Sequence, residues 1–477
     1  MSFSSSAVRA GSNVALKSVF LILTLCSLLV LTFISFNFRA IRENFRLLSN
    51  KADHLDEATA NLTDLITRGT TNAQLFQWYI DQPKTRKQEE IINCDRLFAG
   101  EDKELLSTSL TWTPPCSYAD KDIPVMARNC TAFKTTFQFP NSPFSREEAE
   151  FPLAFVILAE REAEQTIRLL SSIYQPQNAY CLTYDLDTGS KFAKAMESTA
   201  RCFPENVWTP EKKREIYYGD ISILDALLDC LRVLNAKNHA WKYVQFLSWN
   251  DMPLKTNLEM VKILILYKGA SDADLLQSRI DRIRRFHKHG KLDEGEERVK
   301  SIPPHGLIIY KSSLAVTLAR DFANFVLHDP ISKDLLEYLR TTWAPEEHFW
   351  STLIHNVQLN QTGNFPGWCL HFYLWETRQK TWISRYQAWE DLRDPCEGKF
   401  KDESCVFGVG DLALLKNRPE LVAHKFYREF QPAAWYCMHE NHFKKSRKGI
   451  VGINISHYEN MPAVRYNLLK NKEEFTC

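Results

Sequence analysis

The sequence predicts an α/β fold with a mostly parallel sheet covered by helices on both faces. Two observations predict it. From about residue 151, short apolar runs alternate with segments of helical period, and each run has the length of a buried strand. Strand and helix in strict turn form right-handed βαβ units, whose strands pair in parallel. Ligands of such sheets bind beyond the carboxyl ends of the strands, so we expect the functional residues there.

The expected elements follow in order along the chain. Strands are expected at 152–159 (PLAFVILA), 179–187 (AYCLTYDLD), 243–249 (YVQFLSW) and 306–310 (GLIIY). Helices are expected at 162–174, 191–202, 222–234, 258–267, 314–327 and 334–339. The loops after Asp185 and after Trp249 then fall at the ligand-binding edge of the sheet.

A transmembrane helix and a stem are expected to precede this domain. Residues 18–38 contain no charged residue, no Pro and no Gly, and as a helix they would extend about 30 Å, one bilayer core. A cleaved signal peptide is the alternative, but its apolar region would usually be shorter, about 7 to 15 residues. The expected division is a cytoplasmic tail (1–17), a signal anchor (18–38), a stem (39–90), a main domain (91–440) and a C-terminal extension (441–477).

Cysteines and glycosylation sequons indicate that the part after the anchor lies in an oxidising lumen, which gives a type II orientation. Eleven of the twelve cysteines follow residue 38. The sequons lie at Asn61, Asn129, Asn360 and Asn454. The 59 basic and 58 acidic side chains leave a net charge of +1, which excludes the strong overall field typical of nucleic-acid-binding proteins.

Two short acidic motifs and a basic cluster are candidates for chemistry. Asp185 and Asp187 end a predicted strand, where two carboxylates can hold a divalent cation against a diphosphate or simply cap the turn. Glu346 and Glu347 begin a predicted helix after a proline, where acids either cap the helix or remove a proton as a general base. The basic cluster at 279–291 is a candidate substrate contact, whereas the one at 444–448 is interpreted as a solvated surface.

Six strings resemble the core 2/I-branching β-1,6-N-acetylglucosaminyltransferase family, to which the peptide O-xylosyltransferases are related. They are FPLAFVILAE, IYQPQNAYCLTYDLD, ARCFPENV, WKYVQFLSWNDMPLKTNLEMV, APEEHFWSTL and CVFGVGDL, in the family's order and at about its spacing over residues 90 to 440. The resemblance implies a GT-A-type fold with a Rossmann-like sheet, a catalytic domain in the Golgi lumen, and a nucleotide-sugar donor. It also implies an inverting reaction that needs no divalent metal and no other cofactor.

The resemblance assigns roles to individual residues. Glu347 would be the catalytic base, Asp185 would line the nucleotide-sugar pocket, and Lys425 would stabilise the leaving diphosphate. The family's second basic position falls on Asp402, so Lys401 or Lys399 is expected to replace it in donor binding. The acceptor contacts would be Asp274, Arg282, Arg285, Tyr386 and Trp389.

The family's disulfides also map onto this chain. They would be Cys94–Cys437, Cys130–Cys202, Cys181–Cys230 and Cys396–Cys405. The resemblance leaves Cys116, Cys369 and Cys477 without partners, and an intermolecular bond through one of them, linking a homodimer, is left open.

The expected reaction is metal-independent transfer of GlcNAc from UDP-GlcNAc to a primary hydroxyl of an O-glycan, in β-1,6 linkage. A xylosyl- or glucosyltransferase on the same fold is one alternative. A lumenal glycan-binding protein without activity is another, which Asp402 in place of the family's Arg keeps open. A glycoside hydrolase fits poorly, because it needs two carboxylates that face one bond.

Overall fold

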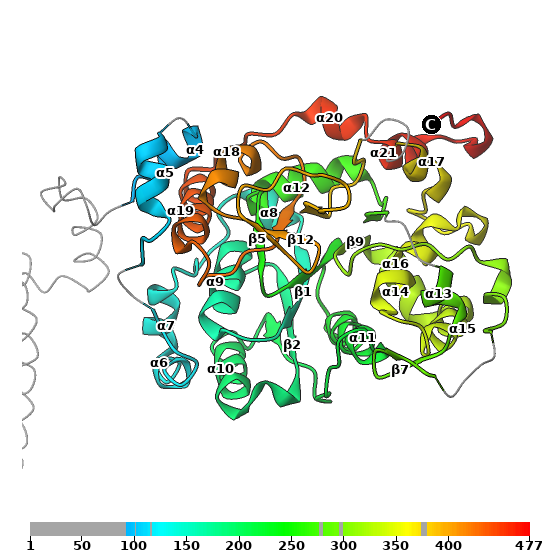
Figure 1. Ribbon diagram of the computed structural model, residues 1–477, viewed down its shortest axis with the longest axis horizontal. Coiled ribbons are helices and arrows are strands. Elements are labelled where there is room, and N and C mark those ends of the chain that lie inside the picture. The colour runs from blue at the N-terminus through cyan, green and yellow to red at the C-terminus, as the bar shows by residue number, and fades with distance from the viewer. Residues whose placement is uncertain (1–91, 101, 115–116, 276–279, 295–298, 374–378) are drawn as a thin grey trace, which may run out of the picture. The chain divides into compact units, whose positions relative to one another are not determined.

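A computed structural model describes residues 92–477, except 101, 115–116, 276–279, 295–298 and 374–378 (Figure 1). The predicted anchor and stem, with the sequon at Asn61, lie outside the described residues. Within the described part of the chain, no helix is long and apolar enough to cross a bilayer.

The centre of the fold is a six-stranded sheet in the order β3-β2-β1-β4-β9-β6. Its strands are β1 (Leu153–Ala159), β2 (Ala179–Tyr184), β3 (Val207–Trp208), β4 (Tyr243–Ser248), β6 (Asp272–Ala273) and β9 (Val316–Ala319). Strands β1 to β4 pair in parallel, and β9 runs antiparallel to both β4 and β6. The mostly parallel sheet predicted from the sequence is therefore present.

Alternate side chains of β1 enter two separate cores, as strand geometry requires. Phe155 and Ile157 pack in one core with α9 (Ala163–Ile173) and α10 (Ser190–Arg201). Ala154 and Val156 pack in the other core with side chains of α11 (Ile221–Ala236), α14 (Arg320–His328), α15 (Pro330–Leu339) and α16 (Glu346–His355). Figure 1 shows α9 and α10 on one side of the sheet and α11 on the other. Helices on both faces leave only the strand ends open to a ligand.

A three-stranded sheet lies beyond these strand ends. It consists of β10 (Arg385–Gln387), β13 (Val422–His424) and β5 (Asp251–Pro253), with β13 in the middle. Register pairs Tyr386 with Ala423 and Ala423 with Met252, and these three side chains lie in one apolar core. The opposite face of this sheet is mostly polar: it carries Asp251, Arg385, Gln387 and His424, and also the apolar Val422 and Pro253.

The prediction for residues 306–327 was wrong. The apolar run at 306–310 forms no strand, because Asn356, the residue after α16, occupies its backbone groups: the Asn356 side chain accepts from the N–H of Ile308 and donates to its carbonyl, at 2.9 and 2.8 Å. The segment 314–327, expected to be one helix, begins instead with strand β9 and continues as α14. Four buried residues of this segment extend the sheet.

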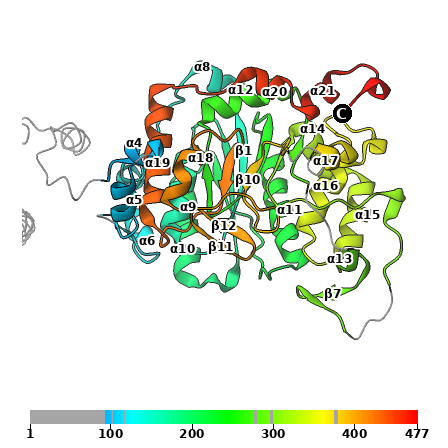
Figure 2. The ribbon, with the colours of Figure 1, turned by 45° about the horizontal axis from the view of Figure 1, so that its top comes forward.

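The remaining elements surround these layers. They are α4 (Cys94–Ala99), α5 (Lys103–Ser109), α6 (Ile123–Met126), α7 (Cys130–Thr136), α8 (Arg146–Glu150), α12 (Asn257–Tyr267), α13 (Ile280–Arg284), β7 (His287–Lys288), β8 (Lys291–Leu292), α17 (Gly367–Phe372), β11 (Lys399–Lys401), β12 (Ser404–Val406), α18 (Leu412–Leu415), α19 (Pro432–Lys448), α20 (Ile455–Glu459) and α21 (Pro462–Leu468). Helix α19 runs through residue 440, and α20 and α21 pack on α12 (Figure 2). Residues 441–477 are thus part of the same folded unit.

Five disulfides are present among the described residues, and four of them join segments at least 49 residues apart. The four pairs expected from the resemblance are bonded in the structure. Cys369 and Cys477, expected to lack partners, are bonded to each other, so neither is available for an intermolecular bond. Cys116, the third expected to be unpaired, lies outside the described residues, and the disulfide-linked dimer stays an expectation.

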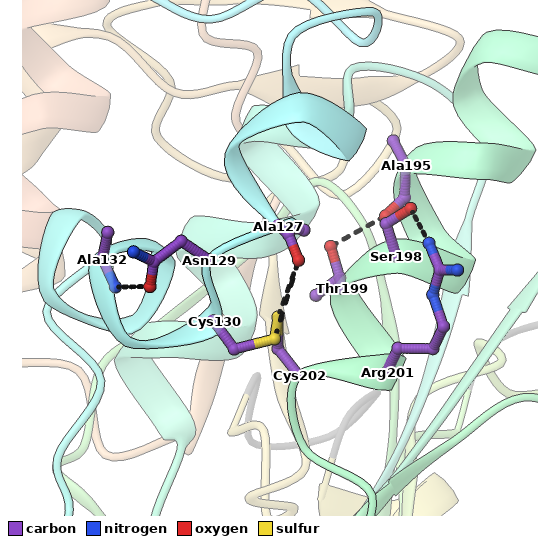
Figure 3. Close-up of a disulfide and its surroundings, with 9 residues drawn as sticks. All are labelled: Ala127, Asn129, Cys130, Ala132, Ala195, Ser198, Thr199, Arg201 and Cys202. Atoms are coloured by element: carbon purple, nitrogen blue, oxygen red, sulfur yellow. Dashed lines mark hydrogen bonds between the residues drawn. A yellow bond between two sulfur atoms is a disulfide. The ribbon is translucent and has the colours of Figure 1, made fainter. Parts of the chain in front are cut away.

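Figure 3 shows the Cys130–Cys202 disulfide, which joins the start of α7 to the residue after α10. Asn129 precedes it and caps α7, because its side-chain oxygen accepts from the N–H of Ala132 at 3.1 Å. The sequon residues Asn129, Asn360 and Asn454 are all exposed.

Candidate active site

Glu347 lies in the first turn of α16, immediately after Pro345 and Glu346. Its N–H donates to the carbonyl of Ala344 at 3.0 Å, and the N–H of Ala344 donates to the carbonyl of Gly219 at 2.9 Å. A proline at the start and acids in the first turn favour a helix that begins here, as the sequence predicts. The start of α16 is therefore held by the loop that contains Gly219.

Asp185 ties this loop to the end of the parallel sheet. It directly follows β2, and its Oδ1 accepts from the N–H of Ile216 at 2.9 Å and from the N–H of Asp187 at 3.1 Å. Residues 214–219 thus run from the carboxyl end of β2 to the start of α16. The carboxylate of Asp185 helps to place Glu347 at the edge where the parallel strands end.

Two cationic side chains contact the same oxygen of Glu347. Nη1 of Arg282 lies 3.3 Å from Oε2, and Nζ of Lys311 lies 3.4 Å from it. The three side chains are 26% (Glu347), 28% (Arg282) and 13% (Lys311) exposed, so all can meet a ligand. The resemblance places Arg282 here, but the sequence gives no signal for Lys311, which lies in no motif.

The segment 311–313 connects Glu347 to Asp274. The N–H of Ser312 donates to the carbonyl of Glu347 at 2.6 Å. The N–H and the hydroxyl of Ser313 both donate to Oδ1 of Asp274, at 2.7 and 3.0 Å. Burial raises the pKa of Asp274, and the charges of Arg385 and Lys311 oppose this rise. The structure therefore brings the predicted acceptor residue Asp274 close to the predicted base.

Glu346, the neighbouring acid, points into the protein. Its side chain is buried, and its Oε2 has no hydrogen-bond partner among the described residues. Burial raises the pKa of Glu346 to about 8, and the charge of Glu347 contributes. Glu346 is therefore mostly neutral at pH 7, and of the two acids only Glu347 is suited to act as a base.

The polar face of the three-stranded sheet carries a buried charge network. Oδ1 of Asp251 lies 2.9 Å from Nδ1 of His424 and 3.6 Å from Nη1 of Arg385. Oδ2 of Asp251 accepts from the N–H of Ser248, the last residue of β4, at 2.8 Å. Burial lowers the pKa of His424 to about 4, and the charge of Arg385 contributes. His424 is thus neutral, and the network fixes the end of β13 beside the end of β4.

Lys425 directly follows this network. Its Nζ donates to the carbonyl of Lys401 at 2.7 Å and lies 3.9 Å from Oδ2 of Asp402. Its side chain is only 7% exposed, whereas that of Asp402 is 76% exposed. Burial lowers the pKa of Lys425, and the charge of Asp402 opposes this. The ammonium groups of Lys401 and Lys425 lie 5.0 and 5.9 Å from the ring centroid of Tyr427, so the two lysines border the same aromatic ring.

Tyr218 lies in the loop that runs from Asp185 to the start of α16. Although most of the residue is exposed, partial desolvation of its hydroxyl raises its pKa, and the charges of Glu347, Glu346 and Asp402 raise it further. A backbone connection joins the Glu347 region to the Lys425 region: Trp389, 6.0 Å from Nζ of Lys311, pairs with Ser404, and Ser404 pairs with Lys401 across β12 and β11.

The three other predicted acceptor residues differ in their positions. The ring centroid of Trp389 lies 6.0 Å from Nζ of Lys311, so Trp389 borders the site. Arg285 follows α13 with its Nε buried. Tyr386 instead points to the apolar face of β10, where it stacks on Phe407 at 5.7 Å between centroids. The structure therefore does not bring the side chain of Tyr386 together with Glu347.

Metal ligands do not gather in the described part of the chain. There, no three His, Cys, Asp or Glu side chains are placed so that they could hold one ion. Asp187, the second acid of the Asp-x-Asp motif, has an exposed side chain in a short 3₁₀ turn.

Comparison with known proteins gives one family. The sequence profile of the Core-2/I-Branching enzyme family matches residues 153–416. A human N-acetyllactosaminide β-1,6-N-acetylglucosaminyl-transferase is 33% identical over 331 residues, which cover 66% of this chain and 78% of that protein. A human probable β-1,3-galactosyl-O-glycosyl-glycoprotein β-1,6-N-acetylglucosaminyltransferase 7 is 30% identical over 360 residues, with coverages of 73% and 81%.

A third relative, the mouse β-1,3-galactosyl-O-glycosyl-glycoprotein β-1,6-N-acetylglucosaminyltransferase 4, is 28% identical over 371 residues, covering 75% of this chain and 80% of its own length. The matched profile spans more than half of the chain and contains β1, β2, β4 and α16, the elements that position Glu347. The chain therefore belongs to the Core-2/I-branching enzyme family and is a glycosyltransferase.

Proposed function

We propose that this enzyme transfers GlcNAc from UDP-GlcNAc to a primary hydroxyl of an O-glycan, in β-1,6 linkage and with inversion. The observation that carries the proposal is the position of Glu347, a partly exposed carboxylate fixed by two cations at the edge where the parallel strands end. The names of the three relatives, which are β-1,6-N-acetylglucosaminyltransferases, support the sugar and the linkage.

The proposed reaction is a single in-line displacement. Glu347 accepts the proton of the acceptor hydroxyl while that oxygen forms a bond to the anomeric carbon of the donor. The bond between this carbon and the diphosphate oxygen breaks, and UDP leaves with the electron pair. Because attack and departure take place on opposite faces of the sugar, the configuration inverts. Lys425 stabilises the negative charge that develops on the departing diphosphate.

Donor binding is assigned to Asp185, Lys425 and Lys401, without a divalent metal and without another cofactor. The support is the placement of two lysines at one spot, with Lys425 fixed by its bond to the carbonyl of Lys401. Fixed cations can supply the charge that a metal ion supplies in other transferases. One position differs from the family resemblance: Asp402 stands where a basic residue is expected. Its carboxylate forms an ion pair with Lys425.

Acceptor binding is assigned to Asp274, Arg282, Arg285 and Trp389, and to Tyr386 only through its effect on the position of β10. Aromatic faces are surfaces on which sugars stack, and Trp389 lies beside Lys311 and therefore near the base.

The acceptor would be an O-glycan on a glycoprotein. The domain would lie in the Golgi lumen as part of a single-pass type II membrane protein, with residues 18–38 as the anchor.

One rival function remains on this fold, a xylosyl- or glucosyltransferase. The deciding experiment incubates the purified full-length protein with a panel of UDP-sugars and O-glycan acceptors and determines the product linkage by mass spectrometry and NMR. The proposal requires a β-1,6-linked GlcNAc product. A product from another UDP-sugar alone would establish the rival function and contradict the proposal.

A further inference from the structure

The contacts of Glu347 show a charge imbalance. Arg282 and Lys311 both contact Oε2, so two cations share one carboxylate. Glu346 does not restore the balance, because burial raises its pKa to about 8 and keeps it mostly neutral at pH 7. In the described part of the chain Asp274 forms no ion pair with Arg282 or Lys311, and its Oδ1 accepts two hydrogen bonds from Ser313. One positive charge at Glu347 therefore has no close counter-charge among these contacts.

The proposed reaction would enlarge this imbalance. When Glu347 accepts the hydroxyl proton, its negative charge is neutralised, and both cations lose the carboxylate that they contact. Lys311 is 13% exposed and Arg282 is 28% exposed, so water screens these charges only in part. A partly buried charge that loses its partner is destabilised. An additional anion at this point would stabilise the site both before and after proton transfer.

The surroundings of the two cations fit a charged sugar. Lys311 lies 6.0 Å from the ring centroid of Trp389, and the guanidinium of Arg282 lies 5.7 Å from that of Trp343. A sugar that stacks on either ring has its substituents beside a cation. A guanidinium binds carboxylate and sulfate groups through paired N–H donors, and an ammonium adds a point charge.

We propose that the acceptor glycan carries an anionic group, a carboxylate or a sulfate ester, close to the hydroxyl that is glycosylated, and that Lys311 and Arg282 bind this group. The proposal rests on the proposed function and adds the chemical class of its acceptor. Binding of the anion would also draw the two cations from Oε2, so that this oxygen becomes accessible to the hydroxyl proton. Lys311 would thus determine acceptor specificity.

The test compares three acceptors that differ at one position: a neutral O-glycan oligosaccharide, the same oligosaccharide with one uronic acid, and the same oligosaccharide with one sulfate. For the unmodified enzyme we expect kcat/KM for at least one anionic acceptor to exceed that for the neutral one by about tenfold or more, the effect of one charge-assisted hydrogen bond. The two anionic acceptors distinguish carboxylate from sulfate. In Lys311→Met this preference should fall to about threefold or less. Lys333→Met, which removes an exposed lysine on α15, should retain it.

Acceptor titrations without donor, followed by saturation-transfer NMR, separate this proposal from the proposed function. If no UDP-sugar yields product, the proposed function fails, whereas the titration still shows whether anionic acceptors bind more tightly and whether Lys311→Met removes the difference. Equal or weaker binding of both anionic acceptors by the unmodified enzyme would overturn the proposal. An equal loss of kcat/KM for all three acceptors in Lys311→Met would do so as well, because Lys311 would then only position Glu347.

Discussion

Oδ2 of Asp402 lies 3.9 Å from Nζ of Lys425, the lysine to which we assign the leaving diphosphate. A carboxylate at this distance competes with a phosphate for the ammonium, although its 76% exposure weakens the pair through solvent screening. We therefore expect Asp402 to lower the affinity for the donor without blocking its binding.

Replacing Asp402 should tighten the binding of UDP. Asp402 has a left-handed backbone, with φ of 52°, which Asn adopts more readily than most residues, so Asp402→Asn removes the charge with little strain. We expect the Kd for UDP to fall about twofold to fivefold, in line with an exposed ion pair. Isothermal titration would measure it. Asp334→Asn, at an exposed position on α15, is the matched control and should leave the Kd unchanged.

Metal removal should not affect the reaction. If Lys425 and Lys401 supply the positive charge, activity after dialysis against EDTA should equal that before it, and added Mn²⁺ should change it by less than about twofold. The assay is product formation from UDP-GlcNAc. A strict requirement for Mn²⁺ would instead indicate that a metal ion held by Asp185 and Asp187 stabilises the leaving diphosphate.

Glu346 should make folding stability fall as the pH rises. Its pKa is about 8 in the folded protein against an ordinary value of 4.5, so between these values the unfolded chain is deprotonated and the folded protein is not. The free energy of unfolding from this group is greatest below pH 4.5 and decreases by up to about 1.4 kcal/mol per pH unit towards pH 8. Urea unfolding at pH 6 and pH 8 would measure it. Glu346→Gln should be less sensitive to pH, and an unchanged pH dependence in this variant would exclude the explanation.

The Cys369–Cys477 disulfide should support the acceptor side of the site. Cys369 and Cys477 pack with Leu275 and Tyr310, which adjoin Asp274 and Lys311 in sequence. Cys477→Ser should lower the free energy of unfolding by about 2 to 4 kcal/mol, as is typical for loss of a native disulfide. The KM for the acceptor should rise, whereas the Kd for UDP should stay constant. A parallel loss of UDP binding would show a general effect on the fold instead.

Local patterns predicted most of the fold and part of the site. The alternation of apolar runs and helical periods gave β1, β2, β4 and the helices between them, and the proline before the acids gave the start of α16. Contacts between distant segments were not predictable in this way. Lys311 reaches Glu347 from a segment without regular structure, and its sequence carries no motif. The run at 306–310 has the apolar pattern of a strand, but hydrogen bonds from the side chain of Asn356 replace those of a sheet.

The pairing of cysteines shows the same limit. The family resemblance gave four disulfides, yet it had no counterpart for Cys369–Cys477, which joins the C-terminal residue to α17. Sequence alone cannot choose among pairings, because the choice depends on which chain segments meet in space. The buried network of Asp251, His424 and Arg385 was missed for the same reason, because its members come from distant segments. In addition, β5 and β10 have only three residues each, too few to show a strand pattern.

The most direct test of the account is the kinetic effect of Glu347→Gln. The amide keeps the shape of the side chain but cannot accept the hydroxyl proton, so we expect kcat to fall by about two to four orders of magnitude. The Kd for UDP and the unfolding temperature should stay close to those of the unmodified enzyme. Glu337→Gln, at an exposed acid of α15, should keep full activity. If Glu347→Gln retained kcat within about tenfold of the unmodified enzyme, Glu347 would not be the base and the proposed mechanism would be wrong.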